Sequence, residues 1–275
     1  MILQERIKTM TQQLFDRVVR VTIESETYKG TFTSDEFEIR FDVAFTDEPK
    51  PNESKIELLN LSKTTINRIK RKSKVTIQAG YKGDFGVLAT GRVTAVSTVR
   101  ENVDNITTVT MLDGEDYGEK SGDITFKANT DARTIINRLA GKMGLKIASI
   151  SLPRNKNYNK GYTVSGELES ALSEVVKDCG ASIYYRRGRM VIRSIKSGDD
   201  ERFTLEEATG LLGVPEPFEE EDAKGYKIQS LLQHRICTAS IIELKSLDVK
   251  GKYRAKRGRH ICNGSDFKTE VDVIS

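Results

Sequence analysis

Phe37-Glu38-Ile39-Arg40-Phe41-Asp42-Val43-Ala44-Phe45 is the stretch that decides the class of fold. Apolar side chains stand at every second position from Phe37 to Phe45, and Glu38, Arg40 and Asp42 stand between them. Side chains alternate across a β-strand, so a period of two predicts a strand with one buried face and one wet face. A chain built on such strands is mainly β.

The same alternation recurs on both sides of this stretch. Ser62 is a typical N-cap for one short helix that runs through Ile69 between predicted strands. Together the pattern predicts a small antiparallel β-barrel or sandwich over residues 17–122. Its other predicted strands are centred on Val19-Val21-Ile23, Ile56-Asn60, Val75-Ala79, Val87-Val99 and Ile106-Leu112.

A helical period begins near Asp123. Thr130 is a candidate cap for a helix that ends at Gly144, and a second helix ends at Gly180. Arg187-Gly188 then predicts the turn of a β-hairpin. Residues 123–198 are therefore expected to form an α+β module. The two buried helical stripes are Ala132, Ile135, Ile136, Leu139, Ala140 and Met143, and Leu168, Leu172, Val175, Val176 and Cys179.

Strand-like stretches return after Gly198 and follow an acidic loop at Pro215 to Asp222. They predict a second small antiparallel β-barrel-like domain over residues 199–275. The fold class is thus mainly β with an α+β insertion, two barrel-like domains flanking an α+β module. Leu3, Ile7, Met10 and Leu14 add a helical arm over residues 1–16, which packs either on its own domain or on a neighbouring subunit. No internal repeat is visible in the sequence.

Composition limits the classes of function. Lys and Arg number 44 against 40 Asp and Glu, so the surface has no overall charge that attracts a polyanion. The absence of Trp argues against a platform that stacks bases. Three widely spaced cysteines predict free thiols in a reducing compartment. No apolar run reaches the length of a bilayer span, so we expect no membrane partner and a chain that is soluble in a cytoplasm.

Catalytic and metal motifs are scarce. His234 and His260 are the two histidines, and with Cys237 and Cys262 they could meet across strands as a Cys2His2 site. Spacings of two residues also arise by chance, so ordinary structural roles are favoured. The glycines at 86 and 91 have phosphate-loop spacing but are followed by Arg92-Val93, which removes the required lysine. We therefore expect no catalytic, cofactor-binding or metal-binding residues and no cofactor.

Two basic stretches admit two interpretations. One ends the short helix and the other alternates along a predicted strand. A phosphate-binding groove is one reading, and solvated surface or ion pairs between subunits is the other, favoured because acids are nearby and aromatics are few. The stretches are Arg68, Lys70, Arg71, Lys72 and Lys74, and Lys250, Lys252, Arg254, Lys256, Arg257 and Arg259.

A series of short motifs in matching order carries a resemblance from about residue 17 to the end. They are Pro51-Asn52-Glu53-Ser54, Leu59-Asn60-Leu61-Ser62, Ala79-Gly80-Tyr81-Lys82-Gly83, Gly210-Leu211-Leu212-Gly213-Val214-Pro215-Glu216, Gly225-Tyr226-Lys227-Ile228-Gln229-Ser230-Leu231-Leu232, Gly251-Lys252-Tyr253-Arg254, His260, and Asp266-Phe267-Lys268-Thr269-Glu270. In these features the chain resembles the baseplate hub proteins of tailed bacteriophages. The family is related to the hub of contractile tails and to the base of type VI secretion spikes.

The resemblance implies a structural protein of the virion tail that is assembled in the host bacterial cytoplasm. It implies a homotrimer in which paired β-barrels form a pseudo-sixfold ring, with the tail tube protein and the tail spike or tip protein as partners. No sequence-specific nucleic-acid partner and no enzymatic activity are expected. Two alternatives stay open, a tail-associated module that binds cell-wall carbohydrate and a peptidoglycan hydrolase.

Overall fold

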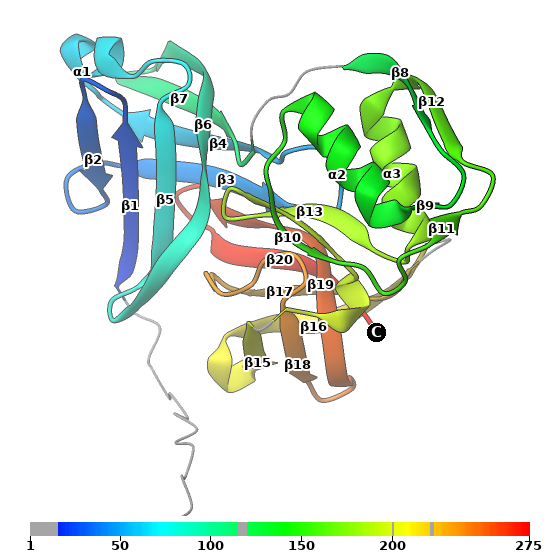
Figure 1. Cartoon of the computed structure of the whole chain (residues 1–275). Coiled ribbons are helices and arrows are strands. Elements are labelled where there is room, and N and C mark those ends of the chain that lie inside the picture. The colour runs from blue at the N-terminus through cyan, green and yellow to red at the C-terminus, as the bar shows by residue number, and fades with distance from the viewer. Residues whose placement is uncertain (1–15, 115–119, 200, 221–222) are drawn as a thin grey trace, which may run out of the picture.

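The computed structural model describes residues 16–114, 120–199, 201–220 and 223–275. The helical arm predicted for residues 1–16 lies outside the described residues, apart from Asp16. Two β regions and one α+β region make up the described chain (Figure 1). The prediction of a mainly β chain with an α+β insertion is confirmed. The exact domain boundaries stay a prediction.

The first β region contains the alternating stretch from Phe37 to Phe45. Ile39, Phe41, Val43 and Phe45 are buried and alternate with half-buried side chains, as the period of two predicts. The Ser62 hydroxyl accepts a hydrogen bond from the Thr65 amide and so begins the short helix. The elements are β1 (Arg17–Glu24), β2 (Lys29–Thr33), β3 (Ile39–Phe45), β4 (Glu53–Leu59), α1 (Lys63–Arg68), β5 (Lys74–Tyr81), β6 (Asp84–Glu101) and β7 (Asp104–Leu112).

The α+β region lies to the right in Figure 1, with α2 and α3 packed side by side. Asp131 caps α2 in place of the expected Thr130, because the Asp131 carboxylate accepts the Thr134 amide. Gly144 ends α2 in the left-handed conformation, as predicted. The elements are β8 (Ser121–Phe126), β9 (Thr130–Asp131), α2 (Ala132–Met143), β10 (Ile147–Ser151), β11 (Asn157–Tyr158), β12 (Tyr162–Glu167), α3 (Leu168–Asp178), β13 (Ser182–Arg186), β14 (Arg189–Arg193) and the 3-10 turn η1 (Ile195–Ser197).

The second β region follows η1 and ends the chain. Its elements are β15 (Arg202–Glu206), the 3-10 turn η2 (Glu207–Thr209), β16 (Leu211–Glu219), β17 (Lys224–Leu231), β18 (Ile241–Lys245), β19 (Lys250–Cys262) and β20 (Phe267–Ile274). The acidic loop predicted at Pro215 to Asp222 is partly the end of β16, and residues 221–222 lie outside the described chain. The core of this region is smaller than that of the first.

The two β regions share one sheet. Among the described residues 13 strands join in the order β16-β17-β20-β19-β3-β4-β7-β6-β5-β1-β2, and β18 and β15 branch from β19. The joint between the regions is the antiparallel pairing of β19 with β3, from Gly258 opposite Phe45 to Cys262 opposite Phe41. The two β regions are therefore not two closed barrels, because β19 pairs across the boundary and each region leaves a strand edge open.

The two β regions also repeat one strand order. The first runs β3-β4-β7-β6-β5-β1, and the second runs β16-β17-β20-β19-β18-β15 with the same sequence connections. A single-residue bulge interrupts the long strand of each, at Thr94 on β6 and at Lys256 on β19. The repeats differ at their ends, since β1 pairs β5 antiparallel and β15 pairs β18 parallel. No helix in the described parts of the chain has the length and apolar character to cross a membrane.

Candidate functional site

A bidentate ion pair joins the first and second β regions. Arg235, in the segment after β17, donates to both carboxylate oxygens of Asp84 at the start of β6, at 2.8 and 2.6 Å. The Asp84 side chain is 14% exposed and that of Arg235 is 31% exposed. Two parallel hydrogen bonds from a guanidinium fix orientation as well as distance. The pair is therefore a direct, oriented contact between the two regions, in addition to the β19–β3 pairing.

The turn between β13 and β14 brings the α+β region to the same place. Arg186 donates to Asp199 and, at 2.8 Å, to Glu201, and Arg187 donates to the carbonyl of His234 at 3.2 Å. These contacts tie the turn to the second β region. The predicted hairpin turn at Arg187-Gly188 is confirmed.

Gly188 ties the same turn to the first β region. It has a φ of +80°, and a Cβ placed on it would lie 2.6 Å from the Thr90 carbonyl oxygen of β6. Both the left-handed backbone and the close approach exclude a side chain. We call the residues Asp84, Arg186, Arg187, Gly188, Asp199, Glu201, His234 and Arg235 the three-way junction.

His234 fills the middle of the junction. Its Nε2 lies 3.9 Å from Asp84, and its ring lies where a side chain on Gly86 would have to go. Burial, with the charge of Arg235 nearby, lowers the pKa of His234 to about 4. The ring is neutral at neutral pH, so it packs as an uncharged spacer between cations.

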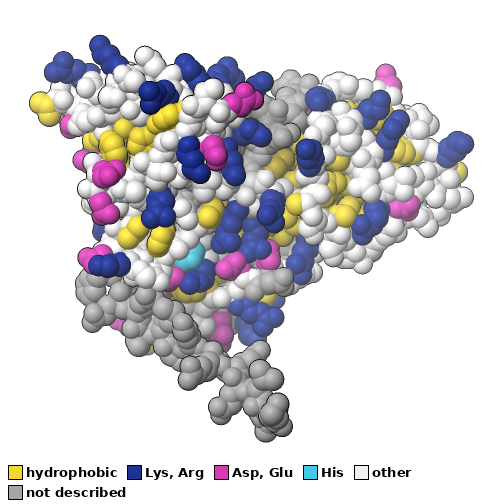
Figure 2. Space-filling model, turned by 60° about the vertical axis from the view of Figure 1, so that its left-hand side comes forward, with side chains coloured by type: hydrophobic (Ala, Val, Ile, Leu, Met, Phe, Trp, Pro, Cys, Tyr) yellow, Lys and Arg dark blue, Asp and Glu magenta, His cyan; other side chains and the backbone are white. Residues whose placement is uncertain are grey.

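A cleft of about 770 Å³ opens beside the junction. Arg189, Val191 and Arg193 line it from alternate positions of β14, and Tyr184 and Arg186 line it from β13. Figure 2 shows Lys and Arg side chains gathered in the middle of one face, next to a histidine. The described lining holds four arginines against Asp199 and Glu201, so the cleft favours anionic groups.

The four residues weighed as a Cys2His2 site do not assemble into one. His260 is buried, and its Nδ1 lies 2.9 Å from the Thr269 hydroxyl. The Cys262 thiol donates to the Ile39 carbonyl, and the Cys237 thiol lies 3.3 Å from Arg186. Within the described residues, no group of three or more His, Cys, Asp or Glu side chains is arranged to hold a metal ion.

Burial raises the pKa of the Asp113 carboxyl group from its ordinary value of 3.8 to about 6. Its carboxylate accepts two hydrogen bonds of 2.8 Å from Asn52, one from the backbone amide and one from the side chain. Asn52 also accepts from the Thr46 hydroxyl. Asp113 is thus a buried group that holds the Pro51-Asn52 turn in place through its hydrogen bonds to Asn52.

The basic stretch on β19 divides into two parts. Lys256 pairs with Asp47, Arg257 with Asp272 and Glu220, and Arg259 with Asp42. These are ion pairs within the chain, and the Arg259–Asp42 pair crosses the β19–β3 joint. Lys250 and Lys252 instead line a groove. In the other stretch, Arg71 and Lys72 line a smaller cavity of about 360 Å³ next to Arg92.

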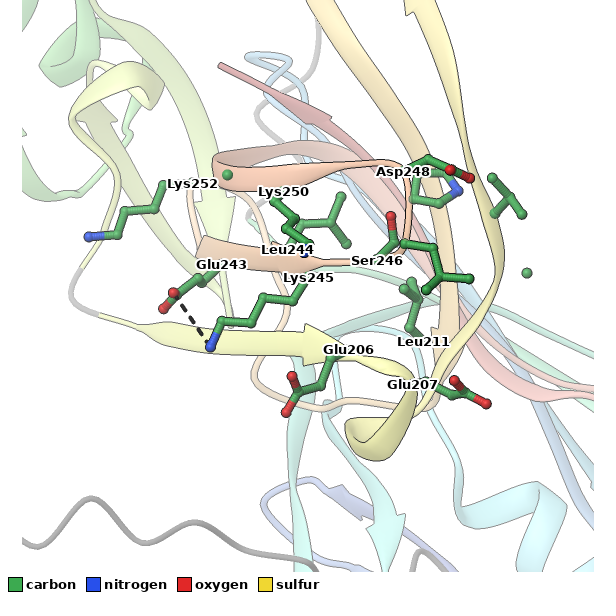
Figure 3. Close-up of a pocket in the computed structure, with 15 residues that line it drawn as sticks. Glu206, Glu207, Leu211, Glu243, Leu244, Lys245, Ser246, Asp248, Lys250 and Lys252 are labelled. Carbon is green, nitrogen blue, oxygen red and sulfur yellow. Dashed lines mark ion pairs between the residues drawn. The ribbon is translucent and has the colours of Figure 1, made fainter.

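The groove at Lys250 and Lys252 has a volume of about 970 Å³ and lies between β16, η2 and the β18–β19 turn (Figure 3). Its charged lining mixes signs, with Glu243 paired to Lys245 at 3.7 Å. Apolar side chains at its rim reach solvent, namely Val214 at 68% and Leu247 at 97% exposure. A mixed, partly apolar groove of this kind is typical of a protein contact surface.

Most of the junction could not be picked out from the sequence. Arg235 and Asp84 stand 151 residues apart, and nothing in either local pattern distinguishes them from other surface charges. The Arg187-Gly188 turn is the one part that a local signal marked. The repeated strand order could not be predicted either, because the corresponding strands have the same pairing pattern but no recognisable sequence similarity.

A family model described as baseplate hub gp41 matches residues 18–248 of the chain. No curated protein sequence matches it. The match covers the first β region, the whole α+β region and the second β region as far as the β18–β19 turn.

Several solved structures share the fold over nearly the whole chain. A tail protein from Neisseria meningitidis MC58 has a TM-score of 0.67 at 8% identity, covering 95% of this chain and 97% of that one. The 43 kDa tail protein of prophage MuSo2 from Shewanella oneidensis has a TM-score of 0.66 at 8% identity, with 93% and 97% coverage. An E. coli type VI secretion component, described as structurally similar to T4 tail proteins gp27 and gp5, has a TM-score of 0.63 at 10% identity, with 92% and 76% coverage. At these identities the likeness concerns the fold alone.

Proposed function

This chain belongs to the baseplate hub gp41 family of phage tail proteins, and from that premise we propose that three copies form a ring in the tail. The two β regions of each copy alternate around the ring, so that six similar units surround one channel. The ring joins a sixfold tail tube on one side to a threefold spike or tip on the other. Assembly takes place in the host cytoplasm before the particle is released.

The repeated strand order is the observation that carries this proposal. Two regions with the same order and the same bulge position lie side by side in one sheet. A closed ring needs contacts between two different surfaces of each subunit, and a repeat of two units per chain gives three chains six such units. Threefold and sixfold neighbours can then both find matching contacts on one ring.

The three-way junction supports the same role. Partly buried ion pairs and the close approach of Gly188 to β6 fix all three regions relative to one another. A part that transmits force between a tube and a spike gains from such fixed geometry. The work of the chain is then mechanical, and we propose that it catalyses no reaction.

Mass measurement tests the proposal directly. The full chain, alone and mixed with the tail tube protein of the same phage, is examined by light scattering and mass photometry. We expect a species of three times 30.8 kDa, and images of particles should place it at the end of the tube. A monomer under all of these conditions would contradict the ring.

The same preparation addresses the two alternatives. Retention of the full chain on purified peptidoglycan would favour a module that binds cell-wall carbohydrate, and a cleared band in a zymogram would favour a hydrolase. The proposed ring predicts neither result.

A further inference from the structure

The β19–β3 pairing joins the two β regions of one chain edge to edge. After its bulge at Lys256, β19 has a strand on each side, with β20 on one edge and β3 on the other. Arg259 and Asp42 form an ion pair across the β19–β3 joint, and the rings of Phe45 and His260 lie 5.2 Å apart there. Backbone pairing, charge and ring contact therefore act together at this joint.

The corresponding strand of the first β region has one of these edges open. β6 pairs with β5 up to Arg92, bulges at Thr94, and then pairs only with β7 as far as Glu101. Among the described residues no strand lies on the other edge of this outer half. In the same way β16, which corresponds to β3, pairs with β17 and has no described strand on its second edge.

Exposed apolar side chains mark both open edges. Of the large apolar residues that are exposed in the described chain, Val99 lies on β6 and Val103 in the turn that follows it, at 64% and 83% exposure. Leu212 and Val214 lie on β16, at 38% and 68%. Exposed apolar residues gathered at two sites indicate surfaces that a partner covers.

We propose that the outer half of β6 in one copy pairs antiparallel with β16 of a second copy, repeating the β19–β3 joint. The inference rests on the proposed ring and names the contact that closes it. One copy offers the β6 edge and its neighbour offers the β16 edge, so the contact joins two different surfaces and continues around the ring.

The strand pairings also give the register of the proposed contact. Ile261 lies opposite Asp42 in the internal joint. Val99 corresponds to Ile261, because each lies five residues after the bulge of its strand, at Thr94 and at Lys256. Val99 pairs with Ile106 on β7, and Ile261 pairs with Lys268 on β20. Glu216 corresponds to Asp42, because the two residues pair with equivalent lysines, Lys227 on β17 and Lys55 on β4. Val99 of one copy is therefore expected opposite Glu216 of the next.

Prolines limit the backbone part of this contact. Pro215 and Pro217 on β16 have no amide hydrogen, so β16 offers fewer donors than β3. Proline on an edge strand also discourages pairing with unrelated strands. The contact between copies must then rely on the apolar side chains of Val99, Leu212 and Val214 more than the internal joint does.

A cysteine pair tests the register. Residues opposite one another in an antiparallel pair have Cα atoms about 4.5 to 5.5 Å apart, which a disulfide can bridge. The variant Val99→Cys, Glu216→Cys is oxidised under mild conditions and run on a non-reducing gel. We expect covalent dimers and trimers that disappear on reduction. The native Cys179 and Cys237 are buried and Cys262 is partly buried, so the parent chain measures the background from native thiols.

A matched variant controls for chance collisions. Val99→Cys, Lys142→Cys also places two thiols at exposed sites, but Lys142 lies on α2 of the α+β region and on neither open edge. We expect no covalent trimer from it. A trimer in light scattering without the Val99–Glu216 cross-link would overturn the joint and leave the ring intact. A monomer with the tube protein present would overturn the ring itself.

Charge at position 99 gives an independent readout. Val99→Glu sets two carboxylates opposite each other and should raise the dissociation constant of the trimer at least about tenfold relative to Val99→Lys, which faces Glu216 with opposite charge. Both changes are at an exposed site, so the melting temperature of the monomer should not change. Equal dissociation constants for the two variants would contradict the register.

Discussion

The two β regions have one strand order and very different surroundings. In the second region, the long strand β19 has a paired strand on both edges after its bulge. Gly258 lies two residues after the bulge at Lys256, and Phe45 and the Glu270 carbonyl occupy the space that a side chain there would need. In the first region the corresponding residue is Val96, on a strand whose outer edge is open. The same topology thus appears once with its neighbour in place and once without it. Residues that differ between the two long strands therefore reflect the presence or absence of the neighbouring strand, and not the strand order.

Filling the space at the internal joint should have the largest effect. A Cβ on Gly258 would lie 2.3 Å from the Glu270 carbonyl oxygen and 2.5 Å from the Phe45 ring. We expect Gly258→Val to lower the free energy of unfolding by about 3 kcal/mol or more, because backbone cannot move aside as a side chain can. At the open edge, Val96 is only half-buried against the core of the first region, and Val96→Ala should cost only about 1 kcal/mol. Urea unfolding of both variants checks the contrast, and equal losses would contradict it.

The two regions should also respond to pH in opposite directions. The pKa of Asp113 in the folded chain, about 6, lies above its ordinary value of 3.8. Its contribution to stability is present below pH 3.8 and is lost as the pH rises through 6. The pKa values of His234 and His260 are lowered by burial to about 4 and about 3. Their contribution is present above pH 6.5 and is lost as the pH falls through 4 and 3.

Replacing Asp113 removes its contribution to the pH dependence of the unfolding free energy. Relative to the parent, Asp113→Asn should gain about 3 kcal/mol of unfolding free energy between pH 4 and pH 7. Asparagine keeps one acceptor oxygen for the Asn52 amide but sets its NH2 group against the Asn52 side-chain donor, a loss that is the same at every pH. Denaturant unfolding at several pH values measures the difference. A difference that does not vary with pH would show that Asp113 titrates normally.

Breaking the ion pair between the regions should have a smaller effect. Arg235→Ala leaves Asp84 partly buried without its guanidinium, and we expect a loss of about 2 kcal/mol. The double variant Asp84→Ala, Arg235→Ala should lose less than the sum of the single changes, because the two side chains interact directly. Thermal unfolding of the four proteins completes the cycle. Additive losses would mean that the pair does not hold the regions together.

The smallest effect is expected at the groove. Glu243 and Lys245 form an ion pair at 3.7 Å with side chains that are nearly half exposed. Lys245→Ala should change the free energy of unfolding by less than about 0.5 kcal/mol, since exposed pairs contribute little. The same measurement on Arg235→Ala serves as the comparison. A larger loss at Lys245 would indicate that the groove is part of the folded core.

Local patterns predicted the parts of this fold that depend on local physics. The alternation from Phe37 to Phe45, the cap at Ser62 and the left-handed stop at Gly144 all reappear in the structure. The family resemblance, read from short motifs, is also confirmed. The motif Pro51-Asn52 has a physical reason in its hydrogen bonds to Asp113.

Long-range pairing could not be predicted from those patterns. The β19–β3 joint brings together residues more than two hundred positions apart, and Arg259 and Asp42 look like ordinary surface charges in their own strands. Two barrel-like domains were expected because strand patterns occur on both sides of the α+β module, and nothing in those patterns indicates that β19 pairs with β3. The junction has the same cause, since only the folded chain brings Asp84 next to Arg235.

The internal joint differs from its proposed copies in one respect, which is the covalent chain that connects its two sides. If β3 and β19 separate, the polypeptide keeps them at a high local concentration and they rejoin at once. The β6–β16 contacts have no such tether, and they weaken as the protein is diluted. A ring of this design therefore has six seams but only three breaking points, and any passage that widens it would open between copies.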